Sequence, residues 1–356
     1  MAADWLRGVA ERDQAASSYG VPRRPETMLV MGASTLRTQF GAAELARLAA
    51  VAALGEPLAV TELDSPRARA RLGVAEVLIT SWGCPPLDEQ ALRHAPRLRA
   101  VLHAAGSVRG HVGQAVFDRD ILVTTAADAN AEPVARYTLA AILWAVKKVP
   151  FLAADARVHR DDWGYRERRG EPRDATPVIV LVGFSRVGCR VARLLQAVGG
   201  ATVLVVDPYA DPAAVAAAGA GLVALADALP RADVLSLHAP DLPSTRHMIG
   251  AAELAALPAG ATFINTARGA LVDHAALGQA CLAGLHAMLD VTDPEPLPRA
   301  SVLYDLPNVM LTPHVAGSLG AETRLMAASA LSELERYAAG LPPLAAVTAR
   351  SMKLQA

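Results

Sequence analysis

The sequence predicts an α/β protein built from two doubly wound, Rossmann-like parallel sheets that follow one another along the chain. Residues 178–207 run from an apolar strand through a glycine turn and a helix to a second apolar strand. On both sides of this unit, short apolar runs alternate with segments of helical periodicity, as is typical of parallel sheets covered by helices on both faces. We expect an interdomain cleft between the two sheets, with ligands bound at the carboxyl ends of the strands.

The first strand of the central unit is Val178–Val182, whose apolar, mostly β-branched residues leave no polar face and so predict burial on both sides. A helix with apolar residues at helical spacing follows and ends at Gly199 and Gly200. The second strand, Thr202–Val206, ends on Asp207, about 20 residues beyond the glycine turn.

The glycine turn reads G-F-S-R-V-G from Gly183 to Gly188 and opens the helix. Free N–H groups at a helix N-terminus can bind a pyrophosphate, and the carboxylate of Asp207 can accept hydrogen bonds from ribose hydroxyls while repelling a 2′-phosphate. The pattern therefore predicts binding of NAD rather than NADP. Ser185 replaces the middle glycine, so we expect a weakened, shifted or hydroxyl-mediated phosphate contact. A buried βαβ unit without a ligand is the alternative.

The segment before the central unit contains several short apolar runs and helical patterns. Strands are expected at 28–31, 58–60, 77–79, 100–103 and 121–123, and helices at 42–54 and at 88–94, where Asp88 can serve as the N-cap. A long helix is expected to begin near Glu132 and Pro133, because proline is tolerated in a first turn, and to reach about Val149. Residues before Met28 are predicted to form an extension.

After the central unit the same alternation resumes. A helix is expected to begin at Asp211 and Pro212, strands at 233–237, 262–265, 286–289 and 309–311, and a last helix at 319–339. The stretch from Phe151 to Ala175 is rich in arginine but interleaved with acids, including Glu171 near Arg173. It is interpreted as a solvated connector or an oligomer arm, with a nucleic-acid patch as the alternative.

Composition narrows the class of protein. The chain has 356 residues, enough for two domains, with 53% hydrophobic but 4% aromatic residues and a net charge of −1. This charge argues against a nucleic-acid or anionic membrane surface. Three widely spaced cysteines predict no metal site or disulfide and fit a reducing compartment. The charged N-terminus does not resemble a signal peptide, and no apolar run reaches the roughly 20 residues of a membrane span. A soluble cytoplasmic protein is expected.

Four polar residues follow predicted strands of the second half of the chain: His238, Arg268, Glu295 and His314. Each has a structural interpretation when taken alone, as a surface arginine, an exposed proline-stiffened loop or a packed histidine. Their joint occurrence at the carboxyl ends of strands in one domain favours a functional site.

The runs that contain these residues resemble a known family. They are A-D-V-L-S-L-H-A-P-D-L-P-S-T-R-H-M-I-G, F-I-N-T-A-R-G-A-L-V-D, L-D-V-T-D-P-E-P-L-P and P-N-V-M-L-T-P-H-V-A-G. They are similar to the D-isomer-specific 2-hydroxyacid dehydrogenases, from about Ala100 to Gly317. The resemblance implies an NAD-binding Rossmann domain (132–317) inserted into a flavodoxin-like substrate domain (1–131 and 318–356). It also implies hinges near 130–132 and 317–320, and a homodimer formed through residues 137–163.

The family implies catalytic roles for three of these residues. Arg268 would hold the carboxylate and carbonyl of the substrate, because a guanidinium is planar and keeps its charge. His314 would be the acid/base, protonating the alkoxide as the keto carbon is reduced. Glu295 would pair with His314, since a neighbouring carboxylate favours the charged imidazolium.

The resemblance also implies ligand contacts. Asp290 would hold the nicotinamide amide, and Asp207 the adenosine ribose. The other expected cofactor-binding residues are Gly183, Ser185, Arg186, Val187, Gly188, His238, Ala239, Pro240, Thr245, Thr266, Ala267 and Gly317. The backbone of Ser107 and Val108 is expected to meet the substrate carboxylate. Arg109 either binds a second anionic group of the substrate or is an exposed loop residue.

The chain departs from the family pattern at several positions. Besides Ser185, the loop S-V-R-G stands where V-G-x-D is usual, Arg136 replaces an acid, and Thr292 replaces a phenylalanine. With Arg268, Glu295 and His314 all present, the sequence predicts an NAD-dependent oxidoreductase that interconverts a 2-keto acid and a D-2-hydroxy acid. The alternatives are a non-catalytic, dinucleotide-sensing regulator or corepressor on the same fold, and a dehydrogenase that oxidises formate or phosphite.

Overall fold

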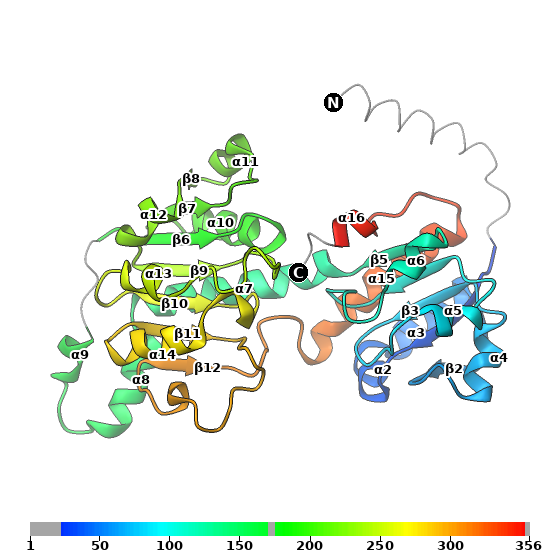
Figure 1. The fold of residues 1–356 in the computed structure, drawn as a ribbon, viewed down its shortest axis with the longest axis horizontal. Helices are drawn as coiled ribbons and strands as arrows, with labels where there is room; N and C mark the ends of the chain where they lie inside the picture. Colours follow the sequence, from blue (N-terminus) through cyan, green and yellow to red (C-terminus); the bar gives the residue numbers. More distant parts are fainter. Residues whose placement is uncertain (1–22, 170–174, 353–356) are drawn as a thin grey trace. The chain divides into compact units, whose positions relative to one another are not determined.

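The computed structural model describes residues 23–169 and 175–352, which form two compact units (Figure 1). Unit 1 contains the chain up to Ala129 together with Gly320–Met352, and unit 2 contains Asn130–Leu319. Most of the predicted N-terminal extension, and Glu171 and Arg173 of the arginine-rich stretch, lie outside the described residues.

Unit 1 is built on a sheet of six strands within the described chain. They are β1 (Glu26–Val30), β2 (Ala53–Val60), β3 (Val77–Thr80), β4 (Ala100–His103), β5 (Leu122–Thr125) and β13 (Ala346–Val347). Their order is β13-β5-β4-β3-β1-β2. The first five are parallel and in the 2-1-3-4-5 order of flavodoxin-like folds, and β13 adds antiparallel to β5.

Helices cover both faces of this sheet. They are α2 (Ala33–Gln39), α3 (Ala42–Val51), α4 (Pro66–Leu72), α5 (Glu89–Arg93), α6 (Gln114–Asp118), α15 (Thr323–Ala338) and α16 (Ala349–Met352). Because successive strand residues point to opposite faces, Met28 packs in the core that contains Leu72 of α4, and Leu29 in the core that contains Leu48 of α3 and Leu331 of α15.

Unit 2 is built on a sheet of seven strands within the described chain. They are β6 (Val178–Val182), β7 (Thr202–Val206), β8 (Gly221–Leu222), β9 (Val234–Leu237), β10 (Thr262–Asn265), β11 (His286–Leu289) and β12 (Val309–Leu311). All pair in parallel, in the order β12-β11-β10-β9-β6-β7-β8. This is the 3-2-1-4-5-6 order of a Rossmann sheet with one more strand, so the direction of winding changes between β6 and β9.

The helices of unit 2 also pack on both faces of their sheet (Figure 1). They are α7 (Ala127–Val146), α8 (Val149–Val158), α9 (Tyr165–Arg168), α10 (Arg186–Val198), α11 (Pro212–Ala217), α12 (Leu225–Ala228), α13 (Ala251–Ala255) and α14 (His274–Leu282). Val180 packs with Leu254 of α13 and Leu277 of α14, whereas Ile179 packs with Val191 of α10. The predicted fold class, two parallel-sheet α/β domains, is confirmed.

Some predicted helix boundaries are wrong. The long helix was expected near Glu132, but α7 begins at Ala127, so Pro133 lies inside it and removes one backbone donor there. The helix expected to reach residue 54 ends at Val51, because the chain enters β2 at Ala53. The last helix begins at Thr323, after a short 3₁₀ turn.

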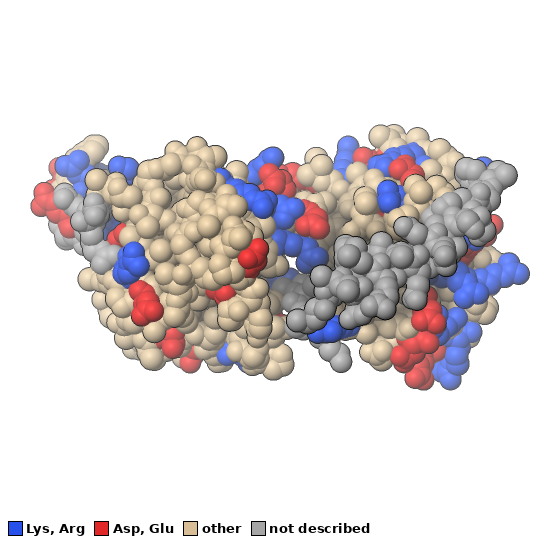
Figure 2. Space-filling model, turned by 90° about the horizontal axis from the view of Figure 1, so that it is seen from above, with Lys and Arg blue, Asp and Glu red and all other residues tan. Residues whose placement is uncertain are grey.

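Charged side chains of both signs are interspersed on the face of the molecule shown in Figure 2, as a net charge of −1 suggests. Among the described residues, none of the helices has both the length and the apolar character needed to cross a membrane.

Candidate active site

The glycine turn closes tightly against the end of β9. Gly183 has φ +101°, and a Cβ atom there would lie 2.6 Å from the carbonyl carbon of His238. A Cβ atom on Gly188 would collide with the carbonyl oxygen of Gly183. The two glycines therefore bring the start of α10 against the point where the winding of the sheet reverses, which is where doubly wound folds bind their ligands.

The first turn of α10 keeps the features that a dinucleotide needs. Ser185 is the N-cap residue, and its φ of −86° is accessible to any L-residue, so the backbone there does not require glycine. At the tip of β7, Asp207 accepts hydrogen bonds from the amides of Phe184 (2.8 Å) and Tyr209 (2.9 Å). The amides of a helix start, a turn closed by two glycines and an acid at the end of the neighbouring strand fit the pyrophosphate and ribose of NAD.

Two other residues expected near the cofactor have local partners. His238 is buried, its Nε2 lies 3.1 Å from Ser236 Oγ, and burial lowers its pKa to about 3, so it is neutral near pH 7. The Thr245 hydroxyl donates to the carbonyl of Pro240 (2.6 Å) and accepts from the amide of Leu242 (2.9 Å). These contacts shape the loop after β9, which also contains Ala239.

Arg268 lies in the loop after β10. The amide group of Asn265 holds this loop, donating to the carbonyl of Arg268 (2.8 Å) and accepting from the amide of Ala267 (3.0 Å). A Cβ atom on Gly269 would collide with the backbone of Thr292. The glycine after the arginine therefore allows the loop after β10 to touch the loop after β11.

Glu295 and His314 are in direct contact. His314 Nδ1 and Glu295 Oε1 are 2.7 Å apart, and about half of each side chain is exposed. The residues come from the loops after β11 and β12 respectively. His314 has φ +53°, a strained conformation for a non-glycine residue, and such conformations are often found at functional sites.

Asp290 fixes the segment that carries His314. Its buried carboxylate accepts hydrogen bonds from the Thr312 hydroxyl (2.6 Å) and from the amides of Val315 (2.8 Å) and Ala316 (2.9 Å). Its carbonyl also accepts from the amide of His314 (2.9 Å). The structure therefore gives Asp290 a role in shaping this loop, and its expected contact with the nicotinamide stays a prediction.

Parallel pairing places these loops at one edge of the sheet. Asn265 is level with Leu289, and Leu289 with Leu311, so β10, β11 and β12 end side by side. Arg268 and His314 follow the outer two of these three strands, and Asp290 and Glu295 follow the middle one.

The expected substrate loop, Ser107–Arg109, belongs to unit 1, where it follows β4 at the carboxyl edge of the sheet. Arg109 Nε donates to the carbonyl of Met352 (3.1 Å). Beneath the loop, His103 Nδ1 lies 2.9 Å from Thr80 Oγ1, and the rings of His103 and His111 are 4.4 Å apart. The predicted role of this loop in binding the substrate carboxylate is not tested by these contacts.

Sequence reasoning did not identify the residues of α7 that hold these loops. Tyr137 Oη lies 2.8 Å from Thr312 Oγ1, and Thr138 Oγ1 lies 2.8 Å from Thr266 Oγ1. The amide of Ser318, next to Gly317, donates to Asn130 Oδ1 (2.9 Å). One signal in the sequence was available: a threonine directly follows both β10 and β12, two residues before Arg268 and two before His314.

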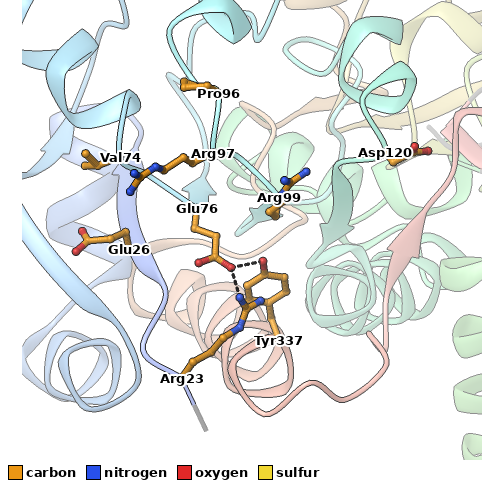
Figure 3. Close-up of a pocket in the computed structure, with 9 residues that line it drawn as sticks. All are labelled: Arg23, Glu26, Val74, Glu76, Pro96, Arg97, Arg99, Asp120 and Tyr337. Atoms are coloured by element: carbon orange, nitrogen blue, oxygen red, sulfur yellow. Dashed lines mark hydrogen bonds and ion pairs between the residues drawn. The ribbon is translucent and has the colours of Figure 1, made fainter. Parts of the chain in front are cut away.

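A cavity of about 600 Å³ in unit 1 is not part of this site (Figure 3). It lies at the amino ends of strands, beside Glu76 and Arg99, which precede β3 and β4. Glu76 is already paired there, accepting from the Tyr337 hydroxyl (2.6 Å) and contacting Arg23 (2.8 Å). None of the predicted site residues lines it.

Comparison with known proteins gives the family. Residues 139–316 match the model of the D-isomer specific 2-hydroxyacid dehydrogenase NAD-binding domain. A D-3-phosphoglycerate dehydrogenase of Mycobacterium bovis is 35% identical over 293 residues, covering 81% of this chain and 54% of that enzyme. An (S)-sulfolactate dehydrogenase of Chromohalobacter salexigens is 36% identical over 237 residues, covering 65% of this chain and 74% of that enzyme.

The fold is shared with solved structures. The crystal structure of the TT0316 protein from Thermus thermophilus has a TM-score of 0.74 and 31% identity, covering 90% of this chain and 100% of that one. This chain belongs to the D-isomer-specific 2-hydroxyacid dehydrogenase family, and unit 2 contains its NAD-binding domain. The chain spans about half the length of the phosphoglycerate dehydrogenases that it matches.

Proposed function

We propose that the protein is an NAD-dependent oxidoreductase that interconverts a 2-keto acid and the corresponding D-2-hydroxy acid. The observation that carries this proposal is the hydrogen bond between His314 and Glu295, at the carboxyl edge of a sheet whose glycine turn suits NAD. A histidine beside a carboxylate, close to a loop that carries an arginine, is the set of groups that carbonyl reduction of a keto acid needs.

Each of the three side chains has a defined role in this proposal. Arg268 binds the substrate carboxylate and orients the carbonyl, because its charge is permanent and its donors form a planar fork. His314 donates a proton to the carbonyl oxygen in reduction and removes it from the hydroxyl in oxidation. Glu295 holds the imidazole by Nδ1, which leaves Nε2 for the substrate.

The turn from Gly183 to Gly188 would hold the pyrophosphate of the cofactor, and Asp207 the ribose hydroxyls. When bound, NADH supplies the hydride that reduces the keto carbon. The carboxylate of Asp207 already accepts hydrogen bonds from the amides of Phe184 and Tyr209. A carboxylate has about four lone-pair sites, so Asp207 can still accept hydrogen bonds from the ribose hydroxyls.

The main test is oxidation of NADH with a panel of 2-keto acids that differ in the group attached to the keto carbon. The panel contains glyoxylate, pyruvate, 3-sulfopyruvate and 3-phosphohydroxypyruvate, because relatives include sulfolactate and phosphoglycerate dehydrogenases. Turnover confined to the last two, and lost in Arg109→Ala, would assign Arg109 to a second anionic group. Turnover of glyoxylate and pyruvate alone, which have no second anionic group, would leave Arg109 as a loop residue without a role in substrate binding.

His314→Ala should abolish turnover and leave NADH binding nearly unchanged. The measurement is steady-state NADH oxidation together with NADH fluorescence titration. His94→Ala, which removes a partly exposed histidine of unit 1 outside the candidate site, is the control and should keep full activity. NADH binding without turnover on every keto acid, in the wild type, would contradict the enzymatic role and favour a dinucleotide-sensing regulator. Reduction of NAD by formate or phosphite would instead indicate a dehydrogenase that oxidises one of these two donors.

We also propose that the protein forms a homodimer through residues 137–163, as the family resemblance implies. Helices α7 and α8 and the segment that follows them leave large apolar side chains exposed, including Leu143 (42%), Trp144 (50%) and Trp163 (67%). Exposed apolar groups that lie on consecutive elements are typical of a surface covered by a partner.

A further inference from the structure

Helix α7 touches the loops of the candidate site at three points within unit 2. Tyr137 contacts Thr312, Thr138 contacts Thr266, and Asn130 accepts a hydrogen bond from the backbone of Ser318. The first and third contacts lie on either side of His314, and the second lies before Arg268. One rigid helix therefore contacts the segments that carry both the arginine and the histidine.

The two hydroxyl contacts are arranged alike. Thr266 is the first residue after β10, and Thr312 is the first after β12. Each is two residues before the side chain with a proposed role, Arg268 or His314. Tyr137 and Thr138 are consecutive on α7, so adjacent positions of one helix hold the start of both loops. A shift of α7 would move the two loops together.

The direction of the Tyr137 contact follows from the number of available protons. Thr312 has one hydroxyl proton and gives it to the carboxylate of Asp290, 2.6 Å away. The Tyr137 hydroxyl must then donate to Thr312, 2.8 Å away. Burial raises the pKa of Tyr137, which keeps this donor protonated. Because Asp290 also accepts from Val315 and Ala316, the chain ends on the backbone beside His314.

The Thr138 contact is enclosed. Thr138 is fully buried, and Thr266 is 8% exposed. In such surroundings a hydroxyl without a partner is costly, so each threonine fixes the rotamer of the other. The position of Thr266 in turn sets the path of the backbone through Ala267 to Arg268.

We propose that Tyr137 and Thr138 are positioning residues, Tyr137 for His314 through Thr312 and Asp290, and Thr138 for Arg268 through Thr266. This inference rests on the proposed function, because it concerns the geometry of the groups that would bind and protonate the substrate. It predicts separate kinetic effects. Loss of the Tyr137 hydroxyl should mainly change proton transfer, and loss of the Thr138 hydroxyl should mainly change binding of the keto acid.

The experiment compares Tyr137→Phe, Thr138→Val and wild type by kcat, by KM for the keto acid and by the pH profile of kcat. Tyr137→Phe should lower kcat about tenfold and change its pH profile, with KM within about twofold, because loosening of a loop by a fraction of an ångström costs this much. Thr138→Val should raise KM about tenfold with an unchanged pH profile. NADH affinity, measured by fluorescence, should change less than the tenfold expected for the kinetic constants, although Thr266 and Asp290 are also expected to lie near the cofactor.

Further variants separate positioning from general damage. Tyr337→Phe removes a comparable half-buried hydroxyl bond in unit 1 (Figure 3) and should change the melting temperature but not the kinetics. Thr138→Ser keeps the hydroxyl and should restore KM. In a Thr312→Val background, Tyr137→Phe should have no further effect, because the path through Thr312 is already broken. If Thr138→Val does not fold, Thr138→Ala tests the same bond.

Two results would overturn the inference. One is an active wild type whose Tyr137→Phe and Thr138 variants all keep kcat and KM within twofold. The other is a Tyr137→Phe, Thr312→Val double variant whose loss of kcat equals the product of the losses in the two single variants. This would mean that the two residues act separately. Absence of turnover in the wild type itself would instead refute the proposed function, and the positioning roles with it.

Discussion

Glu295 is the residue that holds the ring of His314 by its Nδ1. The contact between them is 2.7 Å and half exposed, so its value lies in geometry more than in stability. Glutamine at this position can still accept from Nδ1–H, and it removes only the charge. The variant therefore separates orientation of the imidazole from its electrostatic support.

Glu295→Ala, which removes the acceptor of Nδ1–H, should lower the rate of keto-acid reduction at pH 7.5 on the order of a hundredfold, and Glu295→Gln on the order of tenfold. The order follows because glutamine still accepts from Nδ1–H and orients the ring, whereas alanine does not. The kcat of each variant at pH 7.5 is the measurement. Glu253→Gln, which removes a carboxylate that caps α13 in the same unit, is the control. Equal rates for the two Glu295 variants would contradict an orienting role for this acceptor.

At the scale of elements, the exposed apolar surface of α7, α8 and the segment after them is the proposed dimer interface. Trp144→Glu should convert a dimer of about twice the 37.1 kDa chain mass to a monomer, because a charge at a covered apolar surface stays unpaired. Light scattering coupled to size exclusion measures the mass. Leu282→Glu, at an equally exposed leucine on α14, should leave the mass unchanged. A monomeric wild type, or a dimeric Trp144→Glu variant, would rule out this interface.

Buried strands with mostly apolar residues were predictable from the sequence. Strands such as Thr202–Val206 and His286–Leu289 have the boundaries that their apolar runs indicate, because both faces of a parallel sheet are covered. The start of α7 was not predictable. Pro133 is typical of a first turn, whereas the preceding residues have no apolar periodicity, and tertiary packing extends the helix back to Ala127.

The candidate site was predictable only in part. The carboxyl ends of the strands in a parallel sheet lie at one edge. Because Arg268 and His314 each follow a predicted strand of the same sheet, the sequence indicates that their loops lie at the same edge. The contacts of Asp290 with backbone amides, and of Tyr137 and Thr138 with threonines, depend on how α7 packs against the sheet. The sequence shows the threonines that follow β10 and β12, but it does not show which helix residues their hydroxyls contact, so these pairs appear only in three dimensions.

At the scale of the whole molecule, both units contain buried histidines that fold as neutral groups. Burial lowers the pKa of His103 to about 3 and of His111 to about 4 in unit 1. In unit 2 it lowers the pKa of His238 to about 3 and of His286 to about 4. In the unfolded chain each imidazole regains the ordinary value of about 6.5. Between these values the unfolded chain binds protons that the folded protein does not.

The free energy of unfolding should therefore be constant above about pH 7 and fall as the pH drops from about 6.5 to 5. Each such histidine contributes up to about 1.4 kcal/mol per pH unit. Urea denaturation at pH 7.5, 6.5, 5.5 and 5.0 measures the slope, in a range above the titration of most carboxylates. His286→Gln should reduce the slope for unit 2 by the contribution of up to one proton. His247→Asn, at an exposed histidine of the same unit, should leave the slope unchanged. A slope in this range that His286→Gln does not reduce would show that other groups govern the acid sensitivity of unit 2.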